Sequence, residues 1–411
     1  MMTMWKRYIE ASLTKKITVA LILGFLTGLI FGEKTAVLEP FGDLLLRLLQ
    51  FIIVPLILFT LIVGVNQTRI VRLGRMGGKV FLYYLVTSAL AITVGIGVAS
   101  LFNPGTGMTL EGNESVDVPE NPGIADVLLN IVPENIGTAF TEMNLLGIIF
   151  TAIVFGIGIS YLRSSAEQSE LGERIYRVVE ALNETTLIVM KGLLQYVPIG
   201  IFAIIAGVVG SQGADTLFSL GNFIFVLYVA LLLQLMFYIV ILLMVKKRPG
   251  TFFREARSPM ITAFVTQSSS GTLPLTLTAA ENLGLSKSLY GFSLPFGATI
   301  NMDGAAIRIA VSTVFAANVI GQPLGFADIL QIVLIGTLAS VGTAGVPGAG
   351  IIMIATVFSQ LGLPMEAVAI LAAVDVLIGM GATCLNVTGD LVGTTVINKT
   401  EKKGKETVNA T

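Results

Sequence analysis

Long apolar segments limit what this chain can fold into. Six of them lie in the first 245 residues, and each is long enough for a helix to cross a bilayer, which takes about 20 residues. They lie near residues 17–32, 43–68, 80–102, 124–162, 179–209 and 219–245. The fourth is too long for one span and contains Pro133, so we expect it to be broken. Only 12% of the residues are charged, against about 25% in soluble domains, so the pattern predicts an all-α polytopic membrane protein.

Basic residues occur in alternate loops between these segments. They follow the second, fourth and sixth segments, at Arg69, Arg72, Arg75 and Lys79, at Arg163, Arg174 and Arg177, and at Lys246, Lys247, Arg248, Arg254 and Arg257. Residues 103–125, in contrast, include acidic residues and no basic ones. Because Lys and Arg mark cytoplasmic loops, we expect a multi-pass protein of the cell membrane whose N- and C-termini are both cytoplasmic.

Two units after residue 257 are built differently. The first runs over 259–287 and has two apolar arms of about a dozen residues each, too short to span a bilayer, around a polar tip at 267–274. The second runs over 325–361 around a glycine-rich turn at 340–350. Basic residues flank the first unit, whereas none occurs between Arg308 and Lys399. These patterns predict two re-entrant hairpins, the first from the cytoplasm and the second from outside, with irregular tips that line a site.

An apolar segment with intramembrane polar residues follows each hairpin. The segment at 289–318 contains Asn301, Asp303 and Arg308, and the segment at 366–397 contains Asp375, Asn386 and Asp390. Such residues are costly in hydrocarbon and usually face a water-filled or ion-filled site. Two hairpin-plus-span units entering from opposite faces indicate an inverted repeat, whose interface typically holds the substrate and coupling ions.

The residue types at this interface favour a sodium site and an anion site. Carboxylate and carbonyl oxygens can replace the hydration shell of Na⁺, and Asp303 and Asp390 supply the charge. The serines at 268–270 and the turn at 342–350 could bind an anion through backbone N–H groups. Tight helix packing is the alternative for the small residues, and an Asp303–Arg308 ion pair is the alternative for the charges.

Enzymatic and nucleic-acid functions find little support. The chain has no histidine, a single cysteine and a net charge of −1. An intramembrane protease would need paired carboxylates, but Asp375 and Asp390 lie about four helical turns apart, too far to share a proton. We therefore expect neither an enzyme nor a nucleic-acid-binding protein.

Four motifs in this order resemble the glutamate transporter homologues, the dicarboxylate/amino acid:cation symporter family. They are Ser-Ser-Ser-Gly-Thr-Leu-Pro at 268–274, Gly-Ala-Thr-Ile-Asn-Met-Asp-Gly at 297–304, Ser-Val-Gly-Thr-Ala-Gly-Val-Pro-Gly-Ala-Gly at 340–350 and Asn-Val-Thr-Gly-Asp at 386–390. The resemblance implies eight spans, two re-entrant hairpins, inverted repeats, and a homotrimer embedded in membrane lipid that transports by an elevator mechanism. The scaffold would consist of 1–78, with spans 1 and 2, and of 124–209, with spans 4 and 5 and the trimer contact. The transport domain would consist of 79–123, with span 3 and an outer loop, of 210–253, with span 6, and of the transport core at 254–398. Residues 399–411 would form a cytoplasmic tail.

The resemblance also implies about three Na⁺ ions per substrate. One site would use Gly297, Asn301 and Asn386 through carbonyl groups, with the Asp390 carboxylate. A second would use Thr299, Ser340, Val341 and Thr343, and a third Tyr84, Thr87, Ser88, Asn301 and Asp303. Met302 would couple ion binding to substrate binding.

The substrate site departs from the family pattern. Members that carry acidic amino acids read Asp-x-x-Arg-Thr in the last span, where this chain has Gly379, Ala382 and Thr383. Ala305 replaces a threonine, and Gln267 stands where an arginine often precedes the serines. The implied substrate-binding residues are Ser268, Ser269, Ser270, Met302, Ala305, Arg308, Gly345, Val346, Gly350, Asp375, Gly379, Ala382, Thr383 and Asn386.

Arg308 is the residue on which the substrate prediction depends. It lies three residues after Ala305 on the same helix face, so it could hold a substrate carboxylate in place of the missing arginine. Alternatively it forms an ion pair with Asp303 or Asp375. We expect a sodium-coupled symporter that imports a small organic anion, such as a dicarboxylate without an amino group. A neutral or acidic amino acid symporter and a passive anion channel are the alternatives.

Overall fold

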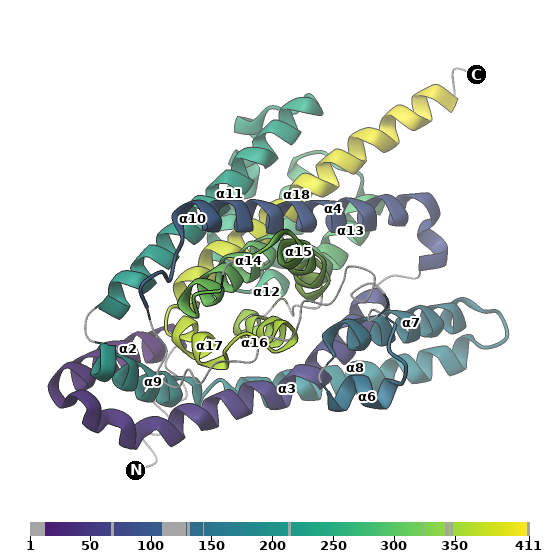
Figure 1. The fold of residues 1–411 in the computed structure, drawn as a ribbon. Coiled ribbons are helices and arrows are strands. Elements are labelled where there is room, and N and C mark those ends of the chain that lie inside the picture. Colours follow the sequence, from purple (N-terminus) through teal and green to yellow (C-terminus); the bar gives the residue numbers. More distant parts are fainter. Residues whose placement is uncertain are drawn as a thin grey trace, which may run out of the picture.

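The computed structural model describes residues 13–66, 70–108, 129, 132–142, 144–212, 215–322, 324–341, 345 and 348–408. All regular structure in these ranges is helical, as predicted. The helices are α2 (Leu13–Phe31), the 3₁₀ helix η1 (Gly32–Leu38), α3 (Glu39–Asn66), α4 (Ile70–Phe102), α6 (Ile136–Thr141), α7 (Leu145–Ser164), α8 (Ser169–Leu193), α9 (Val197–Gln212), α10 (Asp215–Met244), α11 (Pro249–Thr266), α12 (Ser269–Asn282), α13 (Lys287–Ile300), α14 (Asp303–Val319), α15 (Phe326–Val341), α16 (Ala349–Leu361), α17 (Met365–Ala372) and α18 (Asp375–Val408). They are shown in Figure 1.

Several of these helices can cross a membrane. Within the described residues, six stretches are long and apolar enough, or seven when α8 and α9, bent by 45°, count as one span. The first stretch, Lys15–Asn66, is 52 residues long and consists of α2 and α3 joined by η1. Counting α2 and α3 separately raises seven to the predicted eight. The chain is a multi-pass membrane protein.

The helices pack in two groups (Figure 1). Helices α2, α3, α7, α8 and α9 contact one another, and α4, α10, α11, α12, α13, α14, α15 and α18 form the other group. Helices α16 and α17 lie between the two and contact α3 on one side and α14 on the other.

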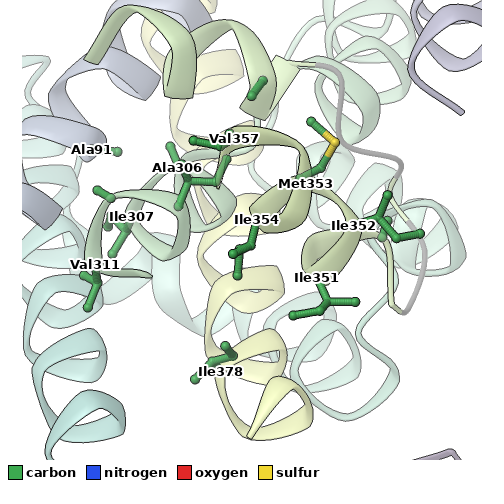
Figure 2. Close-up of a cluster of buried hydrophobic side chains, with 14 of the residues drawn as sticks. Ala91, Ala306, Ile307, Val311, Ile351, Ile352, Met353, Ile354, Val357 and Ile378 are labelled. Atoms are coloured by element: carbon green, nitrogen blue, oxygen red, sulfur yellow. The ribbon is translucent and has the colours of Figure 1, made fainter. Parts of the chain in front are cut away.

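Helix α14 is the centre of the second group. Every residue of α14 except Asn318 is buried, as is expected of a helix covered on all sides. Figure 2 shows its apolar residues in one cluster with α16 and α18, formed by Ala306, Ile307, Val311, Ile351, Ile352, Ile354, Val357 and Ile378. The charged residues Asp303 and Arg308 therefore lie inside protein rather than in contact with lipid.

The hairpins and the breaks agree with the sequence only in part. Helices α15 and α16 form the predicted second hairpin, and the fourth apolar segment is broken between α6 and α7. In the first hairpin, however, α11 begins at Pro249, where proline suits the first helical turn, so this arm has 18 residues. The predicted irregular tip at 267–274 is wrong beyond Ser268, because the Ser268 side chain caps α12 by accepting a hydrogen bond from the Gly271 N–H at 3.0 Å.

The last segment also differs from the prediction. A break at residues 373 and 374 separates α17 from α18, and Asp375 starts α18, where an acidic residue suits the helix dipole. We expected this segment to end before Lys399, but α18 continues to Val408. The Lys- and Glu-rich sequence there consists largely of good helix formers, which extend the helix beyond its apolar part.

Glycine allows the close packing of α2 against α9. A Cβ atom added to Gly28 would lie 2.8 Å from the Ala206 carbonyl oxygen and 2.8 Å from the Val209 Cβ, and Gly24 is similarly close to Phe202. Small residues four apart are a common device for such packing in membranes.

We predict that Gly28→Ala lowers the free energy of unfolding by about 1–3 kcal/mol, as overpacked cores do. The measurement is the melting temperature of the detergent-purified protein. The matched control is Gly158→Ala on α7, where a Cβ atom would meet nothing within 4 Å. Equal melting temperatures for the two variants would contradict this packing.

Candidate functional site

The break between α13 and α14 is the first part of the site. Asn301 and Met302 separate the two helices, and both are buried. At this break, Asp303 accepts hydrogen bonds from the Ser88 hydroxyl at 2.8 Å and from the Tyr238 hydroxyl at 2.5 Å. The ion pair between Asp303 and Arg308 that was the alternative for these charges is therefore absent, since the described partners of Asp303 are neutral hydroxyl groups from α4 and α10.

Asn301 connects this carboxylate region to α18. Its amide donates to the Asp390 carboxylate at 3.0 Å, and its oxygen accepts from the Thr87 hydroxyl at 3.4 Å. Gly297 lies so close that an added Cβ atom would overlap the Asp390 carboxylate and lie 2.8 Å from the Tyr84 hydroxyl oxygen. The Tyr84 hydroxyl itself donates to the Ser293 carbonyl at 3.0 Å. The structure thus brings together most residues of two predicted sodium sites.

Asn386 holds the other side of the same break. Its side-chain oxygen accepts a hydrogen bond from the Gly304 N–H at 2.7 Å, and its amide donates to the Met302 sulfur at 3.1 Å. Asn386 is predicted both as a sodium ligand and as a substrate ligand. Its contact with Met302 connects the two predicted sites by a direct hydrogen bond.

The remaining predicted sodium site is not assembled in the described residues. The Thr299 hydroxyl donates to the Phe296 carbonyl at 3.0 Å, and the Ser340 hydroxyl donates to the Thr337 carbonyl at 2.8 Å. Both bonds stay within one helical turn. Thr343 and the side chain of Val341 lie outside the described part of the chain.

Arg308 forms a buried ion pair with Asp375 across α14 and α18. The exposed fraction is 5% for Arg308 and 6% for Asp375. Gly350 at the start of α16 lies against the guanidinium group, so that an added Cβ atom would overlap it. At Gly379 an added Cβ atom would lie 3.8 Å from the Arg308 Nη1 atom. Of the alternatives for Arg308, the pair with Asp375 is the one present.

The tips of the two hairpins meet at Gly345. Its carbonyl oxygen accepts hydrogen bonds from the Ser268 hydroxyl at 3.0 Å and from the Ser270 N–H at 3.2 Å. A Cβ atom added to Gly345 would lie 3.4 Å from the Ser269 Cβ. The predicted serine run therefore faces the second hairpin, whereas Val346 lies outside the described residues.

The predicted small residues lie along α14 and α18. Ala305 and Ala382 are buried, and the Ala382 carbonyl lies against Gly304, where an added Cβ atom would overlap it. The Thr383 hydroxyl donates to the Gly379 carbonyl at 2.8 Å, within its own helix. In this structure Thr383 therefore has its donor bound to protein.

Three polar residues at the site were not predicted. Tyr238 donates to Asp303, and Gln234 lies one turn before Tyr238 on α10 and is fully buried. Gln267 lies between α11 and α12 with φ +54°. Tyr238 and Gln234 could have been found from the sequence as polar residues inside a long apolar span. The signal for Gln267 was its place at the head of the serine run.

We predict that Arg308→Ala lowers the free energy of unfolding by about 3–5 kcal/mol, because it leaves the Asp375 carboxylate buried without a partner. Arg308→Ala/Asp375→Ala should recover most of this loss, since both charges are then gone. The measurement is thermal unfolding in detergent. A double variant no more stable than the single one would contradict a direct pair.

Comparison with known proteins finds similarity to membrane transporters over nearly the whole chain. The sequence model of the sodium:dicarboxylate symporter family matches residues 13–400. The proton/sodium-glutamate symport protein of Bacillus subtilis is 31% identical over 410 residues, which cover 96% of this chain and 94% of that protein. The C4-dicarboxylate transport protein of Deinococcus radiodurans is 30% identical over 404 residues, covering 95% and 89%. The human neutral amino acid transporter B(0) is 33% identical over 415 residues, covering 89% and 74%.

These relatives are named for three kinds of substrate, and their identities to this chain differ by only a few per cent. Overall similarity therefore does not distinguish the substrate. The match over nearly the whole chain nevertheless decides the class, which is that of transporters and not of enzymes. The chain belongs to the sodium:dicarboxylate symporter family.

Proposed function

We propose that this protein is a sodium-coupled symporter that imports a small dicarboxylate lacking an amino group. The observation that carries the substrate assignment is the Arg308 guanidinium between Gly350 and Gly379. Gly379 stands where members that carry acidic amino acids have the aspartate for the amino group. A cationic group is thus present at the site, and a carboxylate for an ammonium group is missing from position 379.

The donors of Arg308 are suited to a carboxylate. A guanidinium group has five N–H donors in a planar fork, which binds a carboxylate with two parallel hydrogen bonds. Asp375 accepts from Nη2, while Nε is buried with no partner among the described residues. Donors therefore remain for a substrate, and Asp375 positions the guanidinium group.

The balance of charge also favours a dianion. The buried charged residues around α14 and α18 are three carboxylates and one guanidinium group, Asp303, Asp375, Asp390 and Arg308. A site for an acidic amino acid would have one more carboxylate at position 379 to match the ammonium group. Here the carboxylate at position 379 is missing, and a dicarboxylate has no ammonium group. With a dicarboxylate bound, the site therefore has the same net charge as a site with that carboxylate and an acidic amino acid bound.

Sodium coupling rests on two buried carboxylates without a cationic partner. Asp303 and Asp390 are almost fully buried, and their described hydrogen-bond donors are Ser88, Tyr238 and Asn301, which are all neutral. A buried carboxylate without a counter-charge costs several kcal/mol. A sodium ion at each carboxylate supplies that charge. The family resemblance gives about three ions per substrate.

The helix packing supports a moving transport domain. We propose that α2, α3, α7, α8 and α9 form the scaffold of a homotrimer in the cell membrane, and that α4 with α10–α18 moves against it as an elevator. This division is supported by the two packed groups, with α16 and α17, which contact both, assigned to the moving domain because they continue the chain between α15 and α18. Both termini are proposed to be cytoplasmic because basic residues mark the same side.

A neutral amino acid is the second candidate substrate. Arg308 and Asp375 neutralise each other, and residues 305, 379 and 382 are small, so this set of residues is also compatible with a zwitterion. The similarity to a neutral amino acid transporter supports this alternative.

We predict that proteoliposomes with an inward sodium gradient concentrate succinate. Arg308→Ala/Asp375→Ala, which removes both buried charges together, should lower kcat/KM about a hundredfold, as expected for the loss of hydrogen bonds to a charged group. The kcat/KM of Arg308→Lys should lie between those of the wild type and the double variant, because lysine keeps the positive charge but lacks the planar pair of N–H donors.

Competition and gradients separate the alternatives. Uptake that is inhibited by alanine or aspartate but not by succinate or malate would contradict the dicarboxylate assignment. Flux that never exceeds the external concentration would indicate a channel instead.

We predict that Gly297→Ala raises the sodium concentration needed for half-maximal uptake by about tenfold or more, because the new methyl group would displace the Asp390 carboxylate. The measurement is initial uptake against sodium concentration. Gly291→Ala, on the same helix with nothing within 4 Å of an added Cβ atom, is the matched control. Identical sodium curves for the two variants would refute a sodium site at Asp390.

A further inference from the structure

Gln267 has a backbone conformation that is unusual for its residue type. It ends α11 with φ +54° and ψ +31°, in the left-handed region, and its N–H donates to the Ala263 carbonyl at 2.8 Å. Non-glycine residues in this region are uncommon and carry strain, which often marks a functional site. Glycine would fit this turn without strain, so the Gln267 side chain has to be explained by its contacts.

The Gln267 side chain reaches Gly379 on α18. A Cβ atom added to Gly379 would lie 2.6 Å from the Gln267 Oε1 atom and 3.8 Å from the Arg308 Nη1 atom. The amide and the guanidinium group therefore both lie next to the same glycine. Gln267 is only half-buried, whereas Arg308 is buried, so the amide is the more accessible of the two.

We propose that Gln267 is a specificity-determining residue that binds the same substrate carboxylate as Arg308. This inference rests on the proposed function. Oε1 is the amide atom nearest Gly379, and a half-turn of the amide group brings its N–H₂ donor to the same place beside Arg308. A carboxylate can accept from both residues because it offers about four lone-pair sites. The absence of a side chain at Gly379 leaves the space that the Gln267 amide occupies, and any side chain at this position would displace the amide.

The geometry predicts an unusual pattern in a double-mutant cycle with Gln267→Ala and Gly379→Ala. Each single substitution should raise the succinate concentration for half-maximal uptake about tenfold, because each removes the amide from the carboxylate. The double variant should be no worse than either single one, since the methyl group at 379 then has no amide to displace. Contacting residues show such non-additivity, whereas independent sites add.

Two controls separate binding from folding and from sodium coupling. Gln267→Gly relieves the strained backbone, so it should weaken succinate uptake as Gln267→Ala does without lowering the melting temperature. The sodium concentration for half-maximal uptake should stay within about twofold in all of these variants, because none of the residues contacts Asp303 or Asp390 in the described structure.

The outcomes are distinguishable. Sodium-driven succinate uptake in the wild type with unchanged single variants would overturn the role of Gln267 and leave the proposed function intact. Additive losses of about a hundredfold would show that Gly379 acts on its own, which also overturns the proposal. A wild type that does not concentrate succinate would overturn the proposed function and this inference together.

Discussion

The burial of charge without an equal counter-charge is the constraint on which the rest of this structure depends. Of the three buried carboxylates around α14 and α18, one is paired with Arg308, and the other two contact neutral donors. Isolated charges are not stable in a protein interior. We propose that sodium ions at Asp303 and Asp390 supply the missing counter-charge, which would couple transport to sodium.

Broken helices make this arrangement possible. Breaks at residues 267–268, 301–302 and 373–374 divide the helices around the site, so that side chains from several short helices meet there. Asn301 and Asn386 bind across one of these breaks, and Gly297, Gly350 and Gly379 leave room for charged or polar side chains from other helices. The proposed ion site and the proposed substrate site consequently share α14 and α18, and the hydrogen bond between Asn386 and Met302 joins them.

The sequence was most informative where a pattern reports on a single physical requirement. Apolar length predicted the spans, and intramembrane polarity predicted the residues around Asp303 and Asp390. Sequence patterns did not predict features that depend on contacts between segments far apart in the chain. The extent of α11, the role of Tyr238 and the partner of Arg308 all depend on which helices meet, and no local signal contains that information. The C-terminal extension of α18 was not predicted, because we expected the helix to end where the apolar span ends and the polar residues begin.

The most direct test of this account is the thermal stability of the substrate-free protein in sodium chloride and in choline chloride at equal ionic strength. If sodium balances the two buried carboxylates, the melting temperature should rise with sodium alone, and Asp390→Asn, which removes one of those charges, should reduce the rise. Equal melting temperatures in the two salts, or a rise that Asp390→Asn leaves unchanged, would contradict the central claim.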